Sequence, residues 1–376
     1  MISIIGAGPI GSYLGYLLSK NNIENTIVEE HPEIGRPEQC TGLISRNIEG
    51  IIEPSLLKKA AMNKVNGAVI SCGKASFEVK THDFKAYVFD RSKFDKAIAE
   101  KAENKGSKLL LGHSYIDHKL NPQTRQKGLK IGLNFGHKAK YLQSTLLVGA
   151  DGPASKVAKN SSLYGDRKFW TGAQMILKAK EPFFDKSPVY VYLDKRYSDG
   201  FFAWVVPIDE ERAKAGLASY SNTAEHLNRF LKDKFGHFLA ERRSGGLIPV
   251  YNKMPLQNRQ KNIFLVGDAA LQVKATSGGG VVNGMLAAQG LADAISTGKF
   301  DYESRIRGIR RNLWLHSLIR KKLNAMGDAR RSELIEDLCD EKIKNIMQEK
   351  GDMDFVAKFG FNVLAAKPSL LRFLLY

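Results

Sequence analysis

The stretch Ile2-Ser3-Ile4-Ile5-Gly6-Ala7-Gly8-Pro9-Ile10-Gly11 decides how the N-terminal part of this chain folds. The β-branched run before Gly6 predicts a buried strand, and residues 12–18 have the apolar spacing of a helix. A second strand, residues 26–28, ends at Glu29. Strand, glycine turn, helix, strand and terminal acid together predict a dinucleotide-binding unit.

Each part of this unit has a physical role. Gly6 permits a tight turn, Gly8 lets the backbone approach a pyrophosphate, and Gly11 lets the helix pack closely on the strand. The helix N-terminus offers free N–H groups and a partial positive charge to phosphates. Glu29 can accept hydrogen bonds from ribose hydroxyls.

The composition is that of a globular protein. The 376 residues are 43% hydrophobic and 26% charged, and this length predicts two or three structural units. No apolar run reaches 18 residues and the chain opens directly on its first strand, so we expect neither a transmembrane helix nor a signal peptide. Cys40, Cys72 and Cys339 lack metal-ligand spacing. They indicate a reducing, cytoplasmic location without disulfides or a metal site.

The formal net charge of +18 calls for an explanation. The basic residues are scattered and no nucleic-acid motif is present, so nucleic acid is not an expected partner. An anionic membrane surface or a phosphorylated substrate would fit the charge. A well-solvated, lysine-rich surface would fit it equally.

The pattern along the chain predicts a discontinuous domain. Residues 31–45 predict a long loop at the carboxyl end of the second strand, where ligands bind in such sheets. Residues 46–62 predict a helix, and residues 67–79 predict a hairpin. We expect an α/β protein (α+β overall), with a Rossmann-type domain, an inserted antiparallel-sheet substrate domain and a C-terminal helical region. The Rossmann-type domain is expected over residues 1–62, 85–165 and 258–300. The substrate domain is expected over residues 63–84 and 166–257, and the helical region over residues 301–376.

Three separated motifs resemble those of flavoprotein monooxygenases and reductases with the p-hydroxybenzoate hydroxylase fold. They are the first glycine motif with Glu29, then Gly149-Ala150-Asp151-Gly152, and then Gly267-Asp268. This resemblance implies FAD as the cofactor, with Asp268 at its ribityl chain and the helix start at residues 278–281 facing the flavin pyrimidine. A helix N-terminus there would stabilise negative charge on reduced flavin.

A closer resemblance is to geranylgeranyl reductases, especially those acting on archaeal digeranylgeranylglycerophospholipids. Residues 33–42 are similar to that family's proline–cysteine–glycine loop, and residues 202–207 to its substrate-strand motif. Residues 90–95 are similar to its helix start, whose arginine, here Arg91, contacts FAD. The chain departs from the family at Lys274-Ala275, where a proline is usual, and at Phe202 and Val206 in place of tyrosine and phenylalanine.

The resemblance implies a set of site residues. Cys40 and Trp204 are the candidate catalytic residues, expected to face one cavity. Tyr192, Phe202 and Trp204 are candidate substrate-binding residues, although each also fits an ordinary aromatic core position. For Cys40, a small buried hydrophobe is the other interpretation. The candidate cofactor-binding residues are Gly6, Gly8, Ile10, Gly11, Glu29, Glu30, Cys40, Thr41, Gly42, Arg91, Ser114, Asp151, Gly267, Asp268, Gly279, Gly280 and Val281.

The implied function is an FAD-dependent reductase that saturates C=C bonds in the geranylgeranyl chains of membrane lipids or their precursors. NAD(P)H or a reduced ferredoxin-like protein would donate the electrons. An isolated trisubstituted alkene is not electrophilic, so a proton must arrive early, and an apolar, aromatic, water-free site suits the cationic character that develops. A flavin-dependent monooxygenase of the same fold and a non-catalytic flavoprotein or lipid-binding protein are the alternatives.

The C-terminal region combines basic and apolar residues. Between residues 305 and 322, apolar side chains alternate at near-helical spacing with Arg305, Arg307, Arg310, Arg311, Arg320, Lys321 and Lys322. Residues 355–361 and 370–376 are also apolar and basic. Such helices can place arginines on lipid phosphates, which predicts peripheral binding to the inner face of an anionic membrane. A core-facing bundle with solvated arginines is the alternative.

Overall fold

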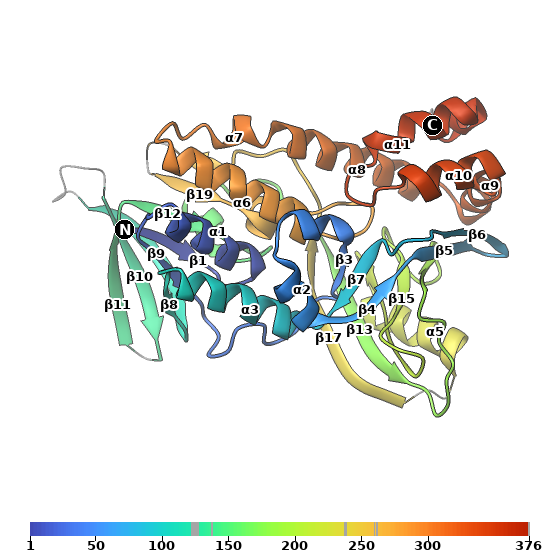
Figure 1. Ribbon diagram of the computed structural model, residues 1–376, viewed down its shortest axis with the longest axis horizontal. Coiled ribbons are helices and arrows are strands. Elements are labelled where there is room, and N and C mark those ends of the chain that lie inside the picture. Colours follow the sequence, from blue (N-terminus) through green and yellow to red (C-terminus); the bar gives the residue numbers. More distant parts are fainter. Residues whose placement is uncertain (122–127, 137, 237–238, 259, 261, 375–376) are drawn as a thin grey trace.

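The computed structural model describes residues 1–121, 128–136, 138–236, 239–258, 260 and 262–374. A six-stranded sheet forms the first layer (Figure 1), and its neighbouring strands are parallel except at the β18 edge. Because parallel neighbours need crossover connections, strands far apart in sequence become adjacent. In spatial order the strands are β18 (Gln257–Asn258), β19 (Ile263–Leu265), β12 (Leu146–Gly149), β1 (Ile2–Ile5), β2 (Asn25–Val28) and β8 (Lys108–Leu110).

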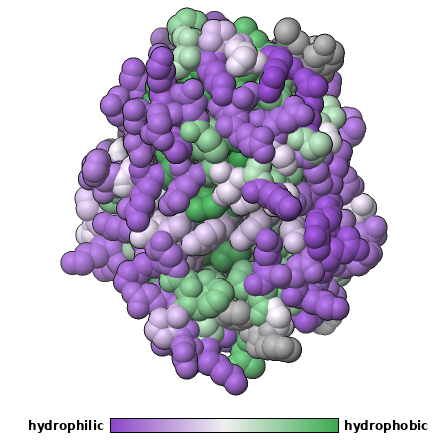
Figure 2. Space-filling view, turned by 90° about the vertical axis from the view of Figure 1, so that its right-hand side faces the viewer, coloured by the Kyte–Doolittle hydropathy of each residue, from purple (hydrophilic) through white to green (hydrophobic). Residues whose placement is uncertain are grey.

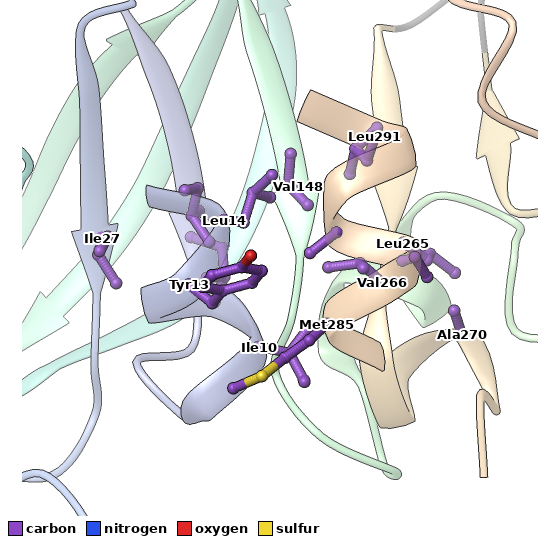
Figure 3. Packing of buried hydrophobic residues seen from close by; sticks show 14 of the residues in the cluster. Ile10, Tyr13, Leu14, Ile27, Val148, Leu265, Val266, Ala270, Met285 and Leu291 are labelled. Atoms are coloured by element: carbon purple, nitrogen blue, oxygen red, sulfur yellow. The ribbon is translucent and has the colours of Figure 1, made fainter. Parts of the chain in front are cut away.

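Three long helices pack together on this sheet. Helix α1 (Pro9–Lys20) lies between α3 (Arg91–Asn104) and α6 (Val281–Ser296). Pro9 suits the first position of α1 because its missing N–H is not needed there. Asp90 caps α3 by accepting a hydrogen bond from the Lys93 N–H at 3.1 Å. Figure 3 shows the buried side chains between α1, α6 and the strands, among them Ile10, Tyr13, Leu14, Val148, Leu265, Met285 and Leu291.

A small antiparallel sheet contacts the parallel one through β12 and β2. Its strands are β9 (His113–Asn121), β10 (Gly128–Phe135) and β11 (Lys138–Ser144). The short helix α4 (Lys156–Asn160) packs on β9 and β12. It is thereby held beside the end of the central strand β12.

A seven-stranded sheet forms the second half of the molecule (Figure 1). Its strands are antiparallel except where β14 pairs with β5, and α5 (Thr223–Phe235) packs on β13 and β16. The hairpin predicted over residues 67–79 is β5–β6. In spatial order the strands are β17 (Leu239–Pro249), β13 (Phe169–Lys178), β16 (Arg212–Ser219), β15 (Ala203–Pro207), β14 (Pro188–Tyr192), β5 (Gly67–Cys72) and β6 (Ala75–Lys80).

The helix predicted over residues 46–62 is wrong in part. A short 3₁₀ helix η1 (Arg46–Gly50) is followed by α2 (Pro54–Ala60), and residue 61 already begins a strand. Pro54 cannot continue a helix from before it, so it starts a new one. The strand that follows, β4 (Ala61–Val65), pairs with β7 (Ala86–Phe89), which also pairs with β3 (Leu43–Ser45).

The described part of the C-terminal region, up to residue 374, contains helices and no strand, so the predicted fold class is confirmed. No described helix is both long and apolar enough to cross a bilayer. Leu375 and Tyr376, which end the predicted apolar segment, lie outside the described residues. The helices of this region are α7 (Tyr302–Arg305), α8 (Arg307–Ala325), α9 (Asp328–Leu338), α10 (Glu341–Lys350), α11 (Ala357–Ala366) and η4 (Pro368–Phe373). A short 3₁₀ helix, η3 (Gly267–Ala270), precedes α6.

Candidate active site

A cavity of about 860 Å³ lies where the parallel sheet meets the seven-stranded sheet. Its walls come from the ends of β1 and β2, the loop of residues 31–42, the start of α6, and strands β13, β14, β15 and β17. Sixteen of the predicted site residues line it: Gly6, Gly8, Ile10, Glu29, Glu30, Cys40, Thr41, Arg91, Asp151, Phe202, Trp204, Gly267, Asp268, Gly279, Gly280 and Val281.

The first glycine motif forms a bare cradle at one end of the cavity. Gly6 has φ +104°, which favours glycine, and a Cβ on Gly11 would lie 2.0 Å from the Gly6 carbonyl oxygen. Gly11 therefore closes the strand–helix contact rather than lining the cavity. A Cβ on Gly8, in contrast, would meet no atom within 4 Å. The cradle thus presents backbone at the N-terminus of α1, which suits an anionic group.

Glu29 ties the end of β2 to this cradle. Its carboxylate accepts hydrogen bonds from the Ala7 N–H at 2.8 Å and the His31 N–H at 3.0 Å, and it contacts the His31 ring at 2.6 Å. The side chain also borders the cavity. Glu29 is therefore fixed in place where a ribose bound beside the cradle would need an acceptor.

Arg91 interacts with Cys40 and with two carboxylates, Asp95 and Asp268, in the lining of the cavity. Arg91 donates two hydrogen bonds of 2.9 Å to Asp95. Burial alone would lower the pKa of Arg91, but its interactions with Asp95 and Cys40 hold it above its usual value. Burial raises the pKa of Asp268 to about 6, against the opposing effect of Arg91. No hydrogen-bond donor in the described chain reaches the Asp268 carboxylate, so it is available to a ligand.

An aromatic wall faces this group from the seven-stranded sheet. The Phe202 ring stacks on Phe201 at 4.2 Å and meets Trp204 edge-on at 5.9 Å. Trp204 Nε1 is buried and has no hydrogen-bond partner among the described residues. Cys40 and Trp204 both line the cavity, so the structure brings the two candidate catalytic residues to one space.

Tyr192 is not part of that wall. It is the last residue of β14, and its ring packs against Tyr197 and Phe230 on the other side of the sheet. Side chains alternate along a strand, so its neighbours Val191 and Leu193 line the cavity instead. The assignment of Tyr192 to the substrate wall is therefore corrected.

Two predicted cofactor residues have structural roles, and a third, Ser114, lies outside the cavity lining. Ser114 does not line the cavity, whereas its neighbours on β9, His113 and Tyr115, do. A Cβ on Gly42 would lie 2.3 Å from the Phe89 carbonyl oxygen, so this glycine lets the loop close onto β7. Asp151 borders the cavity, but its carboxylate accepts hydrogen bonds from Ser155 Oγ at 2.6 Å and the Val157 N–H at 3.0 Å. It thereby holds the start of α4.

Two cavity features were not predicted. Arg320 was expected at the surface but is only 4% exposed. Its guanidinium donates hydrogen bonds to the carbonyls of Ala275 and Thr276 and lies 4.8 Å from the centre of the Phe201 ring. Burial lowers its pKa, and carbonyls and ring faces take the place of a counter-ion. Lys274, noted only as a departure from the family, pairs with Asp354 at the cavity wall. The apolar Leu313, seven positions before Arg320 on α8, was the available signal for the first feature.

Comparison with known proteins places this geometry in a family. A family model described as an FAD binding domain matches residues 1–297. The chain belongs to this FAD-binding family. It is a flavin-dependent oxidoreductase with FAD as its cofactor.

Individual relatives agree with the predicted resemblance to geranylgeranyl reductases. A digeranylgeranylglycerophospholipid reductase from Methanothrix thermoacetophila is 27% identical over 79% of this chain and 78% of its own. An uncharacterised protein from Methanocaldococcus jannaschii is 29% identical over 96% and 94%. The structure of a geranylgeranyl bacteriochlorophyll reductase-like protein from Thermoplasma acidophilum superposes with a TM-score of 0.80 at 20% identity, covering 98% of both chains.

The residues of the cavity fit FAD. The bare Gly8 backbone at the α1 N-terminus suits the pyrophosphate, and fixed Glu29 suits the ribose. The Asp268 carboxylate and the buried, unpartnered Ser277 Oγ lie next to the start of α6. These polar groups lack protein partners in the described chain and would gain them from a polar cofactor.

Proposed function

We propose that this oxidoreductase saturates C=C bonds in the geranylgeranyl chains of membrane lipids or their precursors. The observation that carries the proposal is the shared cavity, because Cys40, Phe202 and Trp204 line the same space as the glycine cradle. The names of the digeranylgeranylglycerophospholipid reductases among the relatives support it.

The cavity provides what alkene saturation needs from the protein. Bound FAD, once reduced by NAD(P)H or a ferredoxin-like protein, would supply a hydride to one alkene carbon, and a proton drawn ultimately from solvent adds to the other. Phe202 and Trp204 exclude water and offer ring faces to carbon that becomes cationic. Cys40 places a thiol in the same cavity, where it contacts the prenyl tail and orients the reacting double bond.

The same proposal includes docking on the inner face of an anionic membrane. One face of α8 exposes Arg307, Arg311, Trp314, Leu318 and Lys321, with Trp314 55% and Leu318 38% exposed. Three of the arginines that the sequence assigned to this basic surface do not contribute a free charge to it. Arg305 and Arg310 pair with Asp301 and Glu303, and Arg320 turns into the cavity.

Further apolar residues are exposed near the C-terminus. Phe361 on α11 is 78% exposed and Leu371 on η4 is 44% exposed. Figure 2 views the end of the molecule that carries the last helices and shows apolar residues at its upper edge and centre within a mostly hydrophilic surface. Cationic and apolar groups together suit the interface of an anionic bilayer.

Anaerobic turnover tests the proposal. The FAD-loaded protein is reduced with dithionite under argon and incubated with a digeranylgeranylglycerophospholipid, and the lipid mass is measured. We expect addition of two hydrogens per double bond without oxygen. A product that requires oxygen would assign a monooxygenase instead, and no turnover of any prenyl lipid would leave a binding protein.

A further inference from the structure

Lys274 lies at the cavity wall beside the glycine-rich start of α6. Its backbone N–H donates to the Gly279 carbonyl at 3.1 Å and its carbonyl accepts from the Gly278 N–H at 2.8 Å, which closes a turn just before the helix. The Lys274 side chain is 4% exposed. A Cβ built on Gly279 would lie 3.3 Å from Lys274 Nζ, so the ammonium group is adjacent to the glycines that border the cavity.

The counter-ion of Lys274 comes from the C-terminal region. Asp354, in the link between α10 and α11, forms the ion pair and is 1% exposed. Its carboxylate also accepts hydrogen bonds from Ser45 Oγ and from Asn47 Nδ2, the latter at 2.9 Å. Burial would raise the pKa of Asp354, but Lys274 and these donors hold it below its usual value. The Asp354 carboxylate is therefore ionised at pH 7.

The backbone around Asp354 is fixed as firmly as its carboxylate. The Asp354 carbonyl accepts a hydrogen bond of 2.6 Å from Asn312 and contacts His316 Nε2 at 3.1 Å. The Met353 carbonyl accepts from Lys274 Nζ at 3.0 Å. Burial lowers the pKa of His316 to about 4, so this ring is neutral at pH 7. The pair is thus held in one geometry from α8, the α10–α11 link and the η1 region.

Stability alone does not explain such a pair. Removing two charges from water costs free energy, and the attraction between them often does not offset that cost. Apolar residues of similar volume would often give equal or greater stability. Its place is informative, because Lys274 and Asp354 both line the cavity next to the α6 N-terminus. Charges at this position act on the electron affinity of a flavin bound there, since a reduced flavin gains negative charge.

We propose that Lys274 and Asp354 set the reduction potential of bound FAD as an opposed pair. The Lys274 ammonium favours the reduced cofactor, and the Asp354 carboxylate favours the oxidised one. The inference rests on FAD binding and is independent of the lipid substrate. Its failure would therefore leave the proposed reductase activity untouched.

Spectroelectrochemical titration of the FAD-loaded full chain tests this pair. Lys274→Met should lower the midpoint potential and Asp354→Asn should raise it. Each should change the equilibrium between oxidised and reduced flavin by at least tenfold, which is about 30 mV for a two-electron couple. Shifts of the two variants in the same direction, or a smaller shift in either, would overturn the proposal.

Two further variants separate charge from structure. Lys274→Arg keeps the charge and should keep the equilibrium within threefold of wild type. If Lys274→Met fails to hold FAD, the upward shift expected for Asp354→Asn decides the matter. Lys367→Met breaks a 2.9 Å ion pair with Asp337 in the same C-terminal region, away from the cavity, and should not change the potential. A shift in Lys274→Arg as large as that expected for Lys274→Met would overturn the proposal.

Discussion

Replacing Gly8 by valine separates cofactor binding from folding. Gly8 has φ −62° and ψ 176°, which any residue adopts, and a Cβ there meets no atom within 4 Å. It is the N-cap of α1 without a side-chain cap, so the variant loses no capping hydrogen bond. We therefore expect the free energy of unfolding to change by about 1 kcal/mol or less.

The effect on FAD should be much larger. The valine side chain would occupy the space through which the backbone approaches the pyrophosphate. A hydrogen bond to a charged group contributes roughly 1.5–3 kcal/mol. Loss of two such bonds weakens binding by about 3 kcal/mol or more, which is roughly a hundredfold in Kd.

Calorimetric titration of FAD-free protein with FAD, together with urea unfolding of the same preparation, measures both quantities. Gly11→Ala is the matched control, because its Cβ would lie 2.0 Å from the Gly6 carbonyl oxygen. That variant should lose stability first. Wild-type FAD affinity in Gly8→Val, or a loss of several kcal/mol of stability in it, would refute the role assigned to the cradle.

Three further outcomes are expected. Cys40→Ala should retain its FAD content but slow or redirect alkene reduction. Cys339 lies outside the cavity lining, so Cys339→Ala should reduce the alkene at the wild-type rate. Equal rates for the two variants, measured by liquid chromatography–mass spectrometry, would contradict this prediction. The pKa of Asp268 is raised from 3.8 to about 6, so the folded state binds the proton more tightly. Stability without FAD should therefore fall by up to about 3 kcal/mol as pH rises from 4 to 6, and Asp268→Asn should abolish that slope in urea unfolding. Replacing Arg307 and Arg311 by serine should weaken binding to anionic vesicles by about 2 kcal/mol, roughly thirtyfold, at low salt; equal sedimentation of wild type with neutral and anionic vesicles would remove the docking proposal.

The sequence allowed prediction of the features that are local. The strand, glycine turn and helix of residues 2–20 are encoded by adjacent residues, because the turn geometry and the helix start depend on Gly6 and Pro9 themselves. The loop that brings Cys40 to the cavity could also be predicted, since it follows a parallel strand.

Features that depend on distant partners could not be predicted in the same way. Both faces of β14 are covered, so alternation alone did not show that Tyr192 faces away from the cavity. Lys274 and Asp354 are separated by 80 positions, and neither carries a local sign of the other. Arg320 resembles its exposed neighbours in residue type, and only its position on the buried face of α8 distinguishes it.

The walls of the FAD cavity draw on residues from Ile5 to Asp354, almost the whole chain. During synthesis the sheet around β1 can form only after β12 and β19 have been made. The last part of the cavity wall forms only when the α10–α11 link has left the ribosome. A nascent chain therefore exposes the apolar surface of an unfinished sheet for most of its synthesis, when aggregation competes with folding. Cofactor supply should consequently influence the yield of this protein after chain release rather than during translation.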